Sequence, residues 1–149
     1  MWSDPAVTRY IGGAPSSRAE AWSRLLRYGG LWPLLGYGYW RIAETASGRF
    51  VGEAGAADFH RDLTPPFGDP ETGWALATWA HGRGFALEAM TAVLKWIDHH
   101  LEAPRTVCMI DADNAPSLRL AAKLGYRQYA VGRYKAQAPL LFERPRGGS

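Results

Sequence analysis

Residues 71–101, ETGWALATWAHGRGFALEAMTAVLKWIDHHL, decide the fold of this chain. The run at 74–79 is apolar and aromatic, as expected of a buried strand. From residue 85 onward, apolar side chains recur at steps of three and four, which predicts a helix over 84–101. Gly82 and Gly84 lie in the turn between the two. The stretch therefore predicts a strand, a glycine turn and an amphipathic helix.

The glycine turn leaves the beginning of the predicted helix open to a ligand. N–H groups in a first helical turn have no helical acceptor, and with the helix dipole they favour an anion by about 0.3–1 kcal/mol, or up to about 2 kcal/mol in a partly buried site. The turn has neither the P-loop pattern nor the G-x-G-x-x-G pattern with a following acidic residue. Two glycines before a helix are also consistent with a plain tight turn.

A second strand and helix follow further along the chain. Pro116 suits the first turn of a helix, Asp113 or Asn114 can cap it, and Gly125 can end it in a left-handed conformation. Taken as structure alone, Asn114 is a cap and Ser117 is a first-turn hydroxyl.

Together the two segments resemble the GCN5-related N-acetyltransferases (GNAT), and within them the RimJ- and RimL-like ribosomal-protein acetyltransferases. The resemblance rests on residues 71–76 (ETGWAL), 81–89 (HGRGFALEA), Asn114 with Ser117, and 123–126 (KLGY), with residues 7–11 and 52–55 as further landmarks. The family's acetyl-CoA motif, [Q/R]-x-x-G-x-[G/A], is matched at Gly84 and Ala86 and departs at His81.

The resemblance implies one GNAT domain over residues 1–146 and a flexible tail at 147–149. Its fold class is mixed α/β, a twisted and mostly antiparallel sheet flanked by helices, with a right-handed parallel crossover over 71–112. Relatives begin with a first strand and a longer first helix, which are missing ahead of residue 4. Either the start is assigned too late or the strand is absent. An absent strand would leave an unpaired sheet edge, which makes a homodimer possible.

The other predicted elements come from local patterns. Ser17-x-x-Glu20 predicts a capping box for a helix that ends at Gly29. That helix is expected to turn inward its apolar residues Trp22, Leu25 and Leu26. Strands are expected over 37–45, 50–59, 71–78 and 105–112, a helix over 115–124, and a closing strand pair at 126–134 and 138–143. Aromatic residues of the first half either line an acceptor groove or form core: Trp22, Trp32, Tyr37, Tyr39 and Trp40.

Composition limits the function. A chain of 149 residues with 47% hydrophobic and 13% aromatic residues is expected to fold as one well-packed domain. A net charge of +3 from scattered basic residues argues against a nucleic-acid partner. No membrane span or signal peptide is predicted. Its one cysteine, Cys108, forms no internal disulfide, and no Cys/His spacing suits zinc, so a cytoplasmic location is expected.

The resemblance implies acetyl-CoA as cofactor, no metal, and direct transfer of an acetyl group to a primary amine. The acceptor would be a protein or peptide N-terminus or a small amine. The residues that it assigns to the cofactor are Leu76, Ala77, Thr78, Gly82, Arg83, Gly84, Phe85, Ala86, Asn114 and Ser117. Arg83 would add charge at the phosphates, although a solvated surface arginine is the simpler alternative.

The resemblance also suggests catalytic residues. Many superfamily members have a tyrosine acid where Ala121 stands, whereas RimJ- and RimL-like relatives have a serine where Ser117 stands, so the resemblance implies Ser117 as the donor to the departing thiolate. Glu71 is the first candidate base and Glu53 the second, and either could be a structural carboxylate. Tyr126 is better explained as core packing. An α-amino group near pKa 8 loses its proton at pH 7 for about 1.2 kcal/mol, against about 4.6 kcal/mol for a lysine, so an N-terminus needs only a weak base.

Two other functions remain open. A non-catalytic acyl-CoA-binding module is suggested by His81 and by the short start. A plain nucleotide-phosphate binder is disfavoured, because the Lys-Ser/Thr and Asp metal motifs of such proteins are missing.

Overall fold

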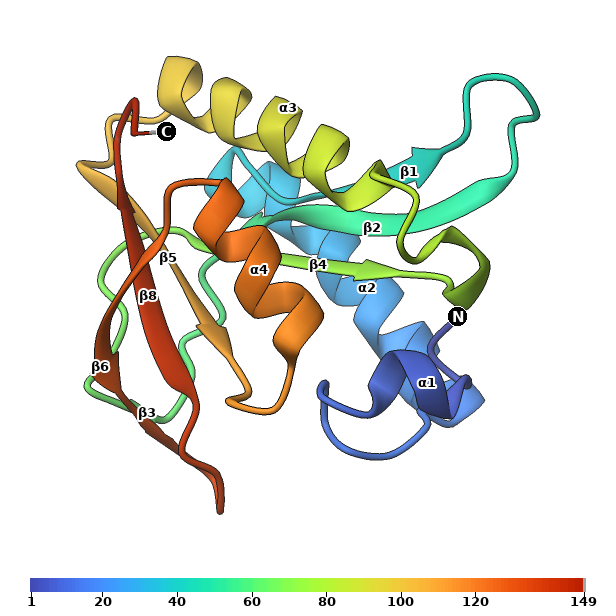
Figure 1. The fold of residues 1–149 in the computed structure, drawn as a ribbon, viewed down its shortest axis with the longest axis horizontal. Helices are drawn as coiled ribbons and strands as arrows, with labels where there is room; N and C mark the ends of the chain where they lie inside the picture. The colour runs from blue at the N-terminus through green and yellow to red at the C-terminus, as the bar shows by residue number, and fades with distance from the viewer. Residues whose placement is uncertain (149) are drawn as a thin grey trace.

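The computed structural model describes residues 1–148, and its centre is a six-stranded sheet in the order β1-β2-β4-β5-β8-β6 (Figure 1). These strands are β1 (Tyr39–Ala43), β2 (Phe50–Ala57), β4 (Glu71–Leu76), β5 (Arg105–Ile110), β6 (Arg127–Val131) and β8 (Leu140–Pro145). Strands β4 and β5 run parallel, whereas the other neighbouring pairs are antiparallel. A short second sheet joins β3 (Leu63–Thr64) to β7 (Arg133–Tyr134). The predicted mixed, mostly antiparallel sheet is confirmed.

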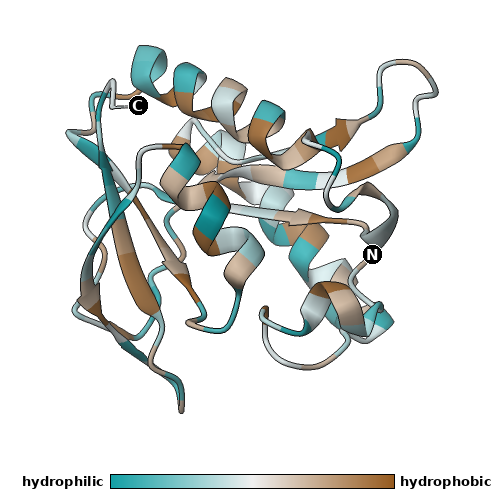
Figure 2. Ribbon diagram, in the orientation of Figure 1, coloured by the Kyte–Doolittle hydropathy of each residue, from teal (hydrophilic) through white to brown (hydrophobic). Residues whose placement is uncertain are grey.

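The helices lie on both faces of the sheet. They are α1 (Pro5–Thr8), α2 (Arg18–Leu35), α3 (Phe85–His100) and α4 (Ala115–Lys123), with a 3₁₀ turn, η1 (Thr78–Ala80), that ends the third predicted strand early. In Figure 1, α4 lies in front of the sheet and α2 behind it. The main core joins α3 and α4 to the sheet through Met90, Val93 and Ala121. Figure 2 shows hydrophobic residues recurring along α3 at helical spacing. No helix within residues 1–148 is long and apolar enough to cross a bilayer.

Helix α2 begins as predicted but ends later. The Ser17 N–H donates to Glu20 Oε2 at 2.6 Å and the Glu20 N–H donates to Ser17 Oγ at 3.2 Å, which confirms the capping box. The predicted end at Gly29 is wrong, because the helix continues to Leu35 and closes on Gly36 at φ +78°. Packing of the residues beyond Gly29 stabilises the helix by more than the roughly 1 kcal/mol that a glycine costs in a helix interior. Leu31 is buried there, and the Trp32 indole donates to the Tyr39 carbonyl at 3.2 Å.

The predicted inward face of α2 is also wrong. Exposed fractions are 59% for Trp22, 58% for Leu25 and 57% for Leu26. The less exposed side of α2 carries Arg24, Tyr28 and Leu31 instead, at helical spacing. Tyr28 stacks on Tyr39 with ring centroids 4.5 Å apart. An aromatic and cationic stripe therefore occupies the contact that simple apolar periodicity assigned to other residues.

Both ends of the chain bear on the predictions. Within residues 1–148 no strand precedes β1, which forms one edge of the sheet, and the possible homodimer stays a prediction. At the other end, the Gly148 N–H donates to the Pro145 carbonyl at 2.9 Å, so 147–148 of the predicted flexible tail form a turn. Ser149 lies outside the described residues.

Candidate active site

Strands β4 and β5 are joined at one end and separate at the other. Within residues 1–148, the pair Glu71–Val107 is the one point at which their backbones are in register. Side chains strengthen this junction, because the Tyr126 hydroxyl lies 2.7 Å from Thr72 Oγ1 and 2.8 Å from Thr106 Oγ1. Tyr126 is buried as predicted, and burial raises its pKa. Beyond this junction the sheet opens.

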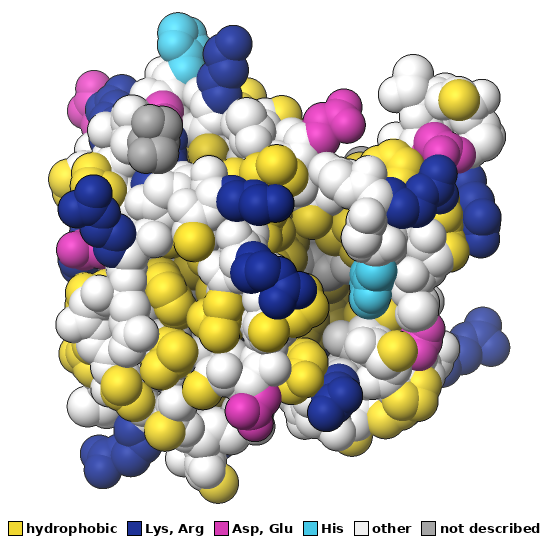
Figure 3. Space-filling model, viewed as in Figure 1, with side chains coloured by type: hydrophobic (Ala, Val, Ile, Leu, Met, Phe, Trp, Pro, Cys, Tyr) yellow, Lys and Arg dark blue, Asp and Glu magenta, His cyan; other side chains and the backbone are white. Residues whose placement is uncertain are grey.

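A groove of about 510 Å³ occupies the opening between β4, α1 and α4, and we call it the β4–α4 groove. Figure 3 shows a hollow in this face of the molecule, with Lys or Arg side chains on one side and a histidine on the other. Residues that line the groove are Ala6, Val7, Tyr10, Ile11, Trp74, Ala75, Leu76, Ala80, His81, Gly82, Gly84, Ala86, Leu87, Asn114, Pro116, Ser117, Arg119, Leu120 and Lys123. The structure thus brings together six of the predicted cofactor residues: Leu76, Gly82, Gly84, Ala86, Asn114 and Ser117.

One end of the groove is the uncapped N-terminus of α3. Gly84 is the N-cap at φ +83°, and no side chain caps the helix. The first helical hydrogen bond runs from the Glu88 N–H to the Gly84 carbonyl at 3.1 Å, so the N–H groups of residues 85–87 have no helical acceptor. A Cβ added at Gly82 or Gly84 would meet no atom within 4 Å, so the space above the turn is open. These donors and this space fit a diphosphate.

The other side of the groove carries a hydroxyl. Asn114 caps α4 as predicted, because its Oδ1 accepts from the Ser117 N–H at 3.2 Å. Across the opening, the Trp74 indole on β4 donates to Ser117 Oγ at 3.1 Å. Both side chains are half-buried. Ser117 is therefore fixed by two hydrogen bonds, one from Trp74 on β4 to its hydroxyl and one from its own N–H to the cap of α4.

Four predicted cofactor residues do not line the groove: Ala77, Thr78, Arg83 and Phe85. Thr78 instead donates to Asp4 Oδ2 at 2.5 Å. Arg83 pairs with Glu44 at 3.5 Å, and its guanidinium lies over the Trp79 ring. The Phe85 side chain packs against a small core cluster, so its backbone N–H is what it can offer a ligand. The Arg83 side chain therefore lies away from the expected phosphate position.

Sequence reasoning missed two cations of the groove. Arg119 and Lys123 line it from α4, and neither forms an ion pair with any residue in 1–148. The signal was present, because Pro116, Arg119, Leu120 and Lys123 follow the spacing of one helix face. His81, the departure from the family motif, also lines the groove, and its Nε2 lies 2.9 Å from the Leu76 carbonyl oxygen.

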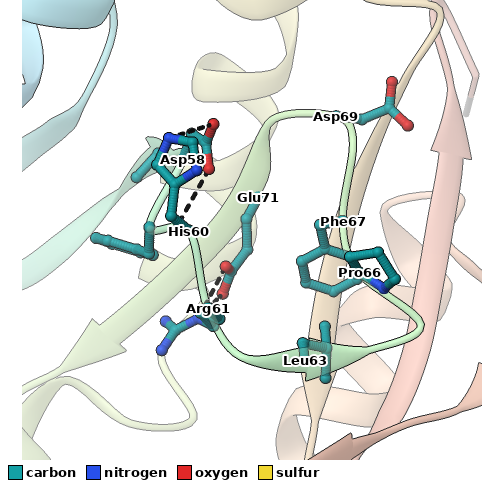
Figure 4. Close-up of a pocket in the computed structure, with 10 residues that line it drawn as sticks. Asp58, His60, Arg61, Leu63, Pro66, Phe67, Asp69 and Glu71 are labelled. Atoms are coloured by element: carbon teal, nitrogen blue, oxygen red, sulfur yellow. Dashed lines mark hydrogen bonds and ion pairs between the residues drawn. The ribbon is translucent and has the colours of Figure 1, made fainter.

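Glu71 lies in a separate cavity of about 230 Å³, shown in Figure 4. The Nε of Arg61 lies 3.0 and 2.9 Å from its two carboxylate oxygens. Burial raises the pKa of Glu71, although hydrogen bonds and charge from Arg61 act in the opposite direction. Phe67 and Pro66 face the same cavity. The structure therefore places Glu71 apart from Ser117, with both oxygens already bound.

Glu53, the second candidate base, lies on β2 next to the groove wall and is not itself among the residues that line the groove. Its residue pairs with Ala75 across β2 and β4, and Ala75 lines the groove. One carboxylate oxygen, Oε1, accepts from the Trp2 indole at 3.1 Å. The other, Oε2, is buried without a hydrogen-bond partner in the part of the chain that the structure describes. The Tyr28 hydroxyl lies near this carboxylate, and burial and then the charge of Glu53 raise the pKa of Tyr28 to about 12.

Comparison with known proteins identifies the family. The model of the acetyltransferase (GNAT) domain matches residues 1–127. A GnaT-family acetyltransferase from Bordetella pertussis is 36% identical with a TM-score of 0.79, over 93% of this chain and 86% of that one. The chain therefore belongs to the GNAT acetyltransferase family, and it is an acetyl-CoA-dependent acetyltransferase.

More distant structures share the fold. A ribosomal-protein-S5-alanine acetyltransferase from Vibrio fischeri is 17% identical with a TM-score of 0.66, over 90% of this chain and 73% of that one. A spermidine N-acetyltransferase from Vibrio cholerae, solved with CoA and spermine, is 12% identical with a TM-score of 0.74, over 98% of this chain and 86% of that one. At these identities the similarity is one of fold alone.

Proposed function

We propose that this protein transfers the acetyl group of acetyl-CoA directly to a primary amine, using the β4–α4 groove for the cofactor. One observation carries the proposal: the groove joins the uncapped N-terminus of α3 to the Ser117 hydroxyl. The first feature suits a diphosphate and the second suits a departing sulfur. Acetyl-CoA carries both groups and supplies an acetyl carbon activated as a thioester.

Each part of the groove has a stated task in this proposal. The N–H groups of residues 85–87 hold the diphosphate, and Arg119 and Lys123 add positive charge along α4. Ser117 donates a hydrogen bond to the sulfur as it leaves. A thiol has a reference pKa near 8.5, so its thiolate needs one nearby donor rather than a strong acid.

The acceptor in this proposal is a protein or peptide N-terminus or a small amine, and membership of the RimJ/RimL-like branch remains part of it. Of the two carboxylates that could take the amine's proton, Glu53 fits better. Its Oε2 has no partner within residues 1–148 and its residue is in register with the groove, whereas both oxygens of Glu71 are bound to Arg61.

Thiol release with a panel of dipeptides, polyamines and aminoglycosides tests the proposal. Purified protein should release CoA thiol in the presence of acetyl-CoA and at least one acceptor, and mass spectrometry should detect the acetylated amine. Ser117→Ala should lower kcat several-fold while the Kd for acetyl-CoA changes little, because its hydroxyl acts on the leaving sulfur. An unchanged kcat, where chemistry limits the rate, would remove Ser117 from this role.

The alternative of a non-catalytic acyl-CoA-binding module makes a different prediction. Calorimetry would then show acetyl-CoA binding at the same groove, but no amine in the panel would accelerate thiol release. Absence of binding heat at millimolar acetyl-CoA would contradict both proposals, because each requires a cofactor in the groove.

A further inference from the structure

Trp74 and Ser117 face each other across the opening of the sheet. The indole Nε1 lies 3.1 Å from the Ser117 Oγ, and the two residues are 43 positions apart in the sequence. Trp74 packs against both core clusters, so its ring is held by the body of the protein. Both residues line the β4–α4 groove. This hydrogen bond is therefore a rigid contact within the wall that the cofactor meets.

The chemistry of the two groups gives this contact a direction. An indole N–H is a donor only, whereas a serine hydroxyl has one proton and two lone pairs. Trp74 must therefore donate, and it occupies one lone pair of the Ser117 oxygen. It cannot accept the serine proton. No residue within 1–148 accepts that proton either, and the Ser117 N–H is bound to Asn114. The hydroxyl proton is left for a ligand in the groove.

We infer that Trp74 is a positioning residue that holds the Ser117 hydroxyl ready to donate to the leaving sulfur, an inference that rests on the proposed acetyl transfer. The amine nitrogen bonds to the acetyl carbon, and the carbon–sulfur bond breaks with its electron pair on sulfur. Ser117 donates a hydrogen bond to this sulfur, and the indole N–H, by drawing electron density from Oγ, strengthens that hydrogen bond. The proton released by the amine leaves to a carboxylate or to water, and the thiolate takes a proton from water to leave as the CoA thiol.

Trp74→Phe tests this inference because phenylalanine keeps an aromatic ring but cannot donate. Loss of one hydrogen bond should lower kcat by about five- to tenfold, while the Kd for acetyl-CoA stays within about twofold. Trp79→Phe is the matched control, since its indole also donates to an oxygen, the Phe50 carbonyl, at 3.1 Å, and Trp79 is not among the residues that line the groove. It should leave kcat unchanged.

Two further measurements separate positioning from a general structural role. In the Trp74→Phe/Ser117→Ala double variant, kcat should fall no further than in Ser117→Ala, because Trp74 acts only through the hydroxyl. The thiol of bound CoA, titrated by the ultraviolet absorbance of the thiolate, should have a lower pKa in the wild type than in either single variant.

Three results would overturn the inference. The first is a double variant in which the losses of kcat from the two substitutions multiply. The second is a Kd for acetyl-CoA that rises in Trp74→Phe as much as kcat falls, and the third is a pKa of the bound CoA thiol that is the same in the wild type and in the single variants. If Trp74→Phe does not fold, NMR spectra of the wild type and of Ser117→Ala are compared instead. The indole N–H resonance of Trp74 should shift in Ser117→Ala, because the oxygen that accepts its hydrogen bond has been removed. A wild-type protein that binds acetyl-CoA but acetylates no amine would instead contradict the proposed function, independently of Trp74.

Discussion

The Nε of Arg61 lies between the two carboxylate oxygens of Glu71, at 3.0 and 2.9 Å. Both side chains are largely buried, and Arg61 also donates to the Tyr134 hydroxyl at 3.3 Å. The contact therefore ties the loop after β2 to the beginning of β4 and to β7. This geometry is that of a structural ion pair.

We therefore expect Glu71→Gln to affect stability more than catalysis. Weakening hydrogen bonds to a charged group should lower the free energy of unfolding by about 1.5–3 kcal/mol in urea titrations. The pH–rate profile of the folded variant should match that of the wild type. Glu102→Gln, at an exposed position, is the control and should change neither quantity. A profile that loses its acidic limb would restore Glu71 as the base.

Glu53→Gln should lower activity in a way that depends on the acceptor. An acceptor with a lysine-like pKa must give up about 4.6 kcal/mol to become neutral at pH 7, against about 1.2 kcal/mol for an α-amino group. If Glu53 takes the proton, kcat/KM should fall more with a polyamine than with a dipeptide. Equal losses with both acceptors would show that Glu53 does not serve as the base.

Gly84→Trp should abolish acetyl-CoA binding measured by calorimetry. The residue has φ +83° and open space above it, so a large side chain would be strained and would fill the space at the N-terminus of α3. Gly147→Trp is the matched control, because Gly147 also has a positive φ, +69°, and open space, but lies near the end of the chain. The control should bind acetyl-CoA like the wild type. Retained binding by Gly84→Trp would place the diphosphate elsewhere.

Arg119→Met and Lys123→Met should each weaken acetyl-CoA binding by about two- to fivefold, because each removes an exposed positive charge from the groove. The loss should shrink at high salt. It should also be smaller for acetyl-dephospho-CoA if these cations contact the phosphate on the ribose. Lys95→Met, exposed on α3 outside the groove, controls for net charge. Identical losses in the control would mean that the effect is long-range rather than local.

Asp98→Asn should destabilise the protein at neutral pH but not in acid. Arg144 donates to the two oxygens of Asp98 at 3.0 and 2.8 Å and joins β8 to α3. Burial acts to raise the pKa of Asp98, but hydrogen bonds from Arg144 and from the Gly147 backbone, with the charges of Arg144 and Arg146, together lower that pKa.

The sign of the effect follows from this lowered pKa. A folded-state pKa below the unfolded value of about 3.9 means that the stabilisation is present above about pH 4 and is lost as the pH falls through the folded value. Urea titrations at neutral and strongly acidic pH should therefore show a difference that disappears in acid. Asp62→Asn, at an exposed position, should show none. A difference that persists in strong acid would contradict the assignment.

Local patterns in the sequence predicted much of the cofactor side of the site. The glycine turn, the uncapped α3 and the Asn114 cap depend on residues within four positions of each other, and the structure contains each of them. The same reasoning misplaced the inward face of α2. Apolar periodicity does not foresee that Arg24 packs on the ring of Trp2, ahead of α1, and that Tyr28 packs on the ring of Tyr39 in β1.

The sequence by itself determined the strand–turn–helix units, because hydrogen bonds within a turn and the period of a helix are encoded in short stretches. Only the tertiary structure decided which side chains meet. Trp74 and Ser117 are 43 positions apart, and Arg61 reaches Glu71 because a loop folds back on β4. Such contacts depend on how the elements pack, so the separation of Glu71 from the groove and the hydrogen bond on Ser117 came from packing rather than from any local pattern.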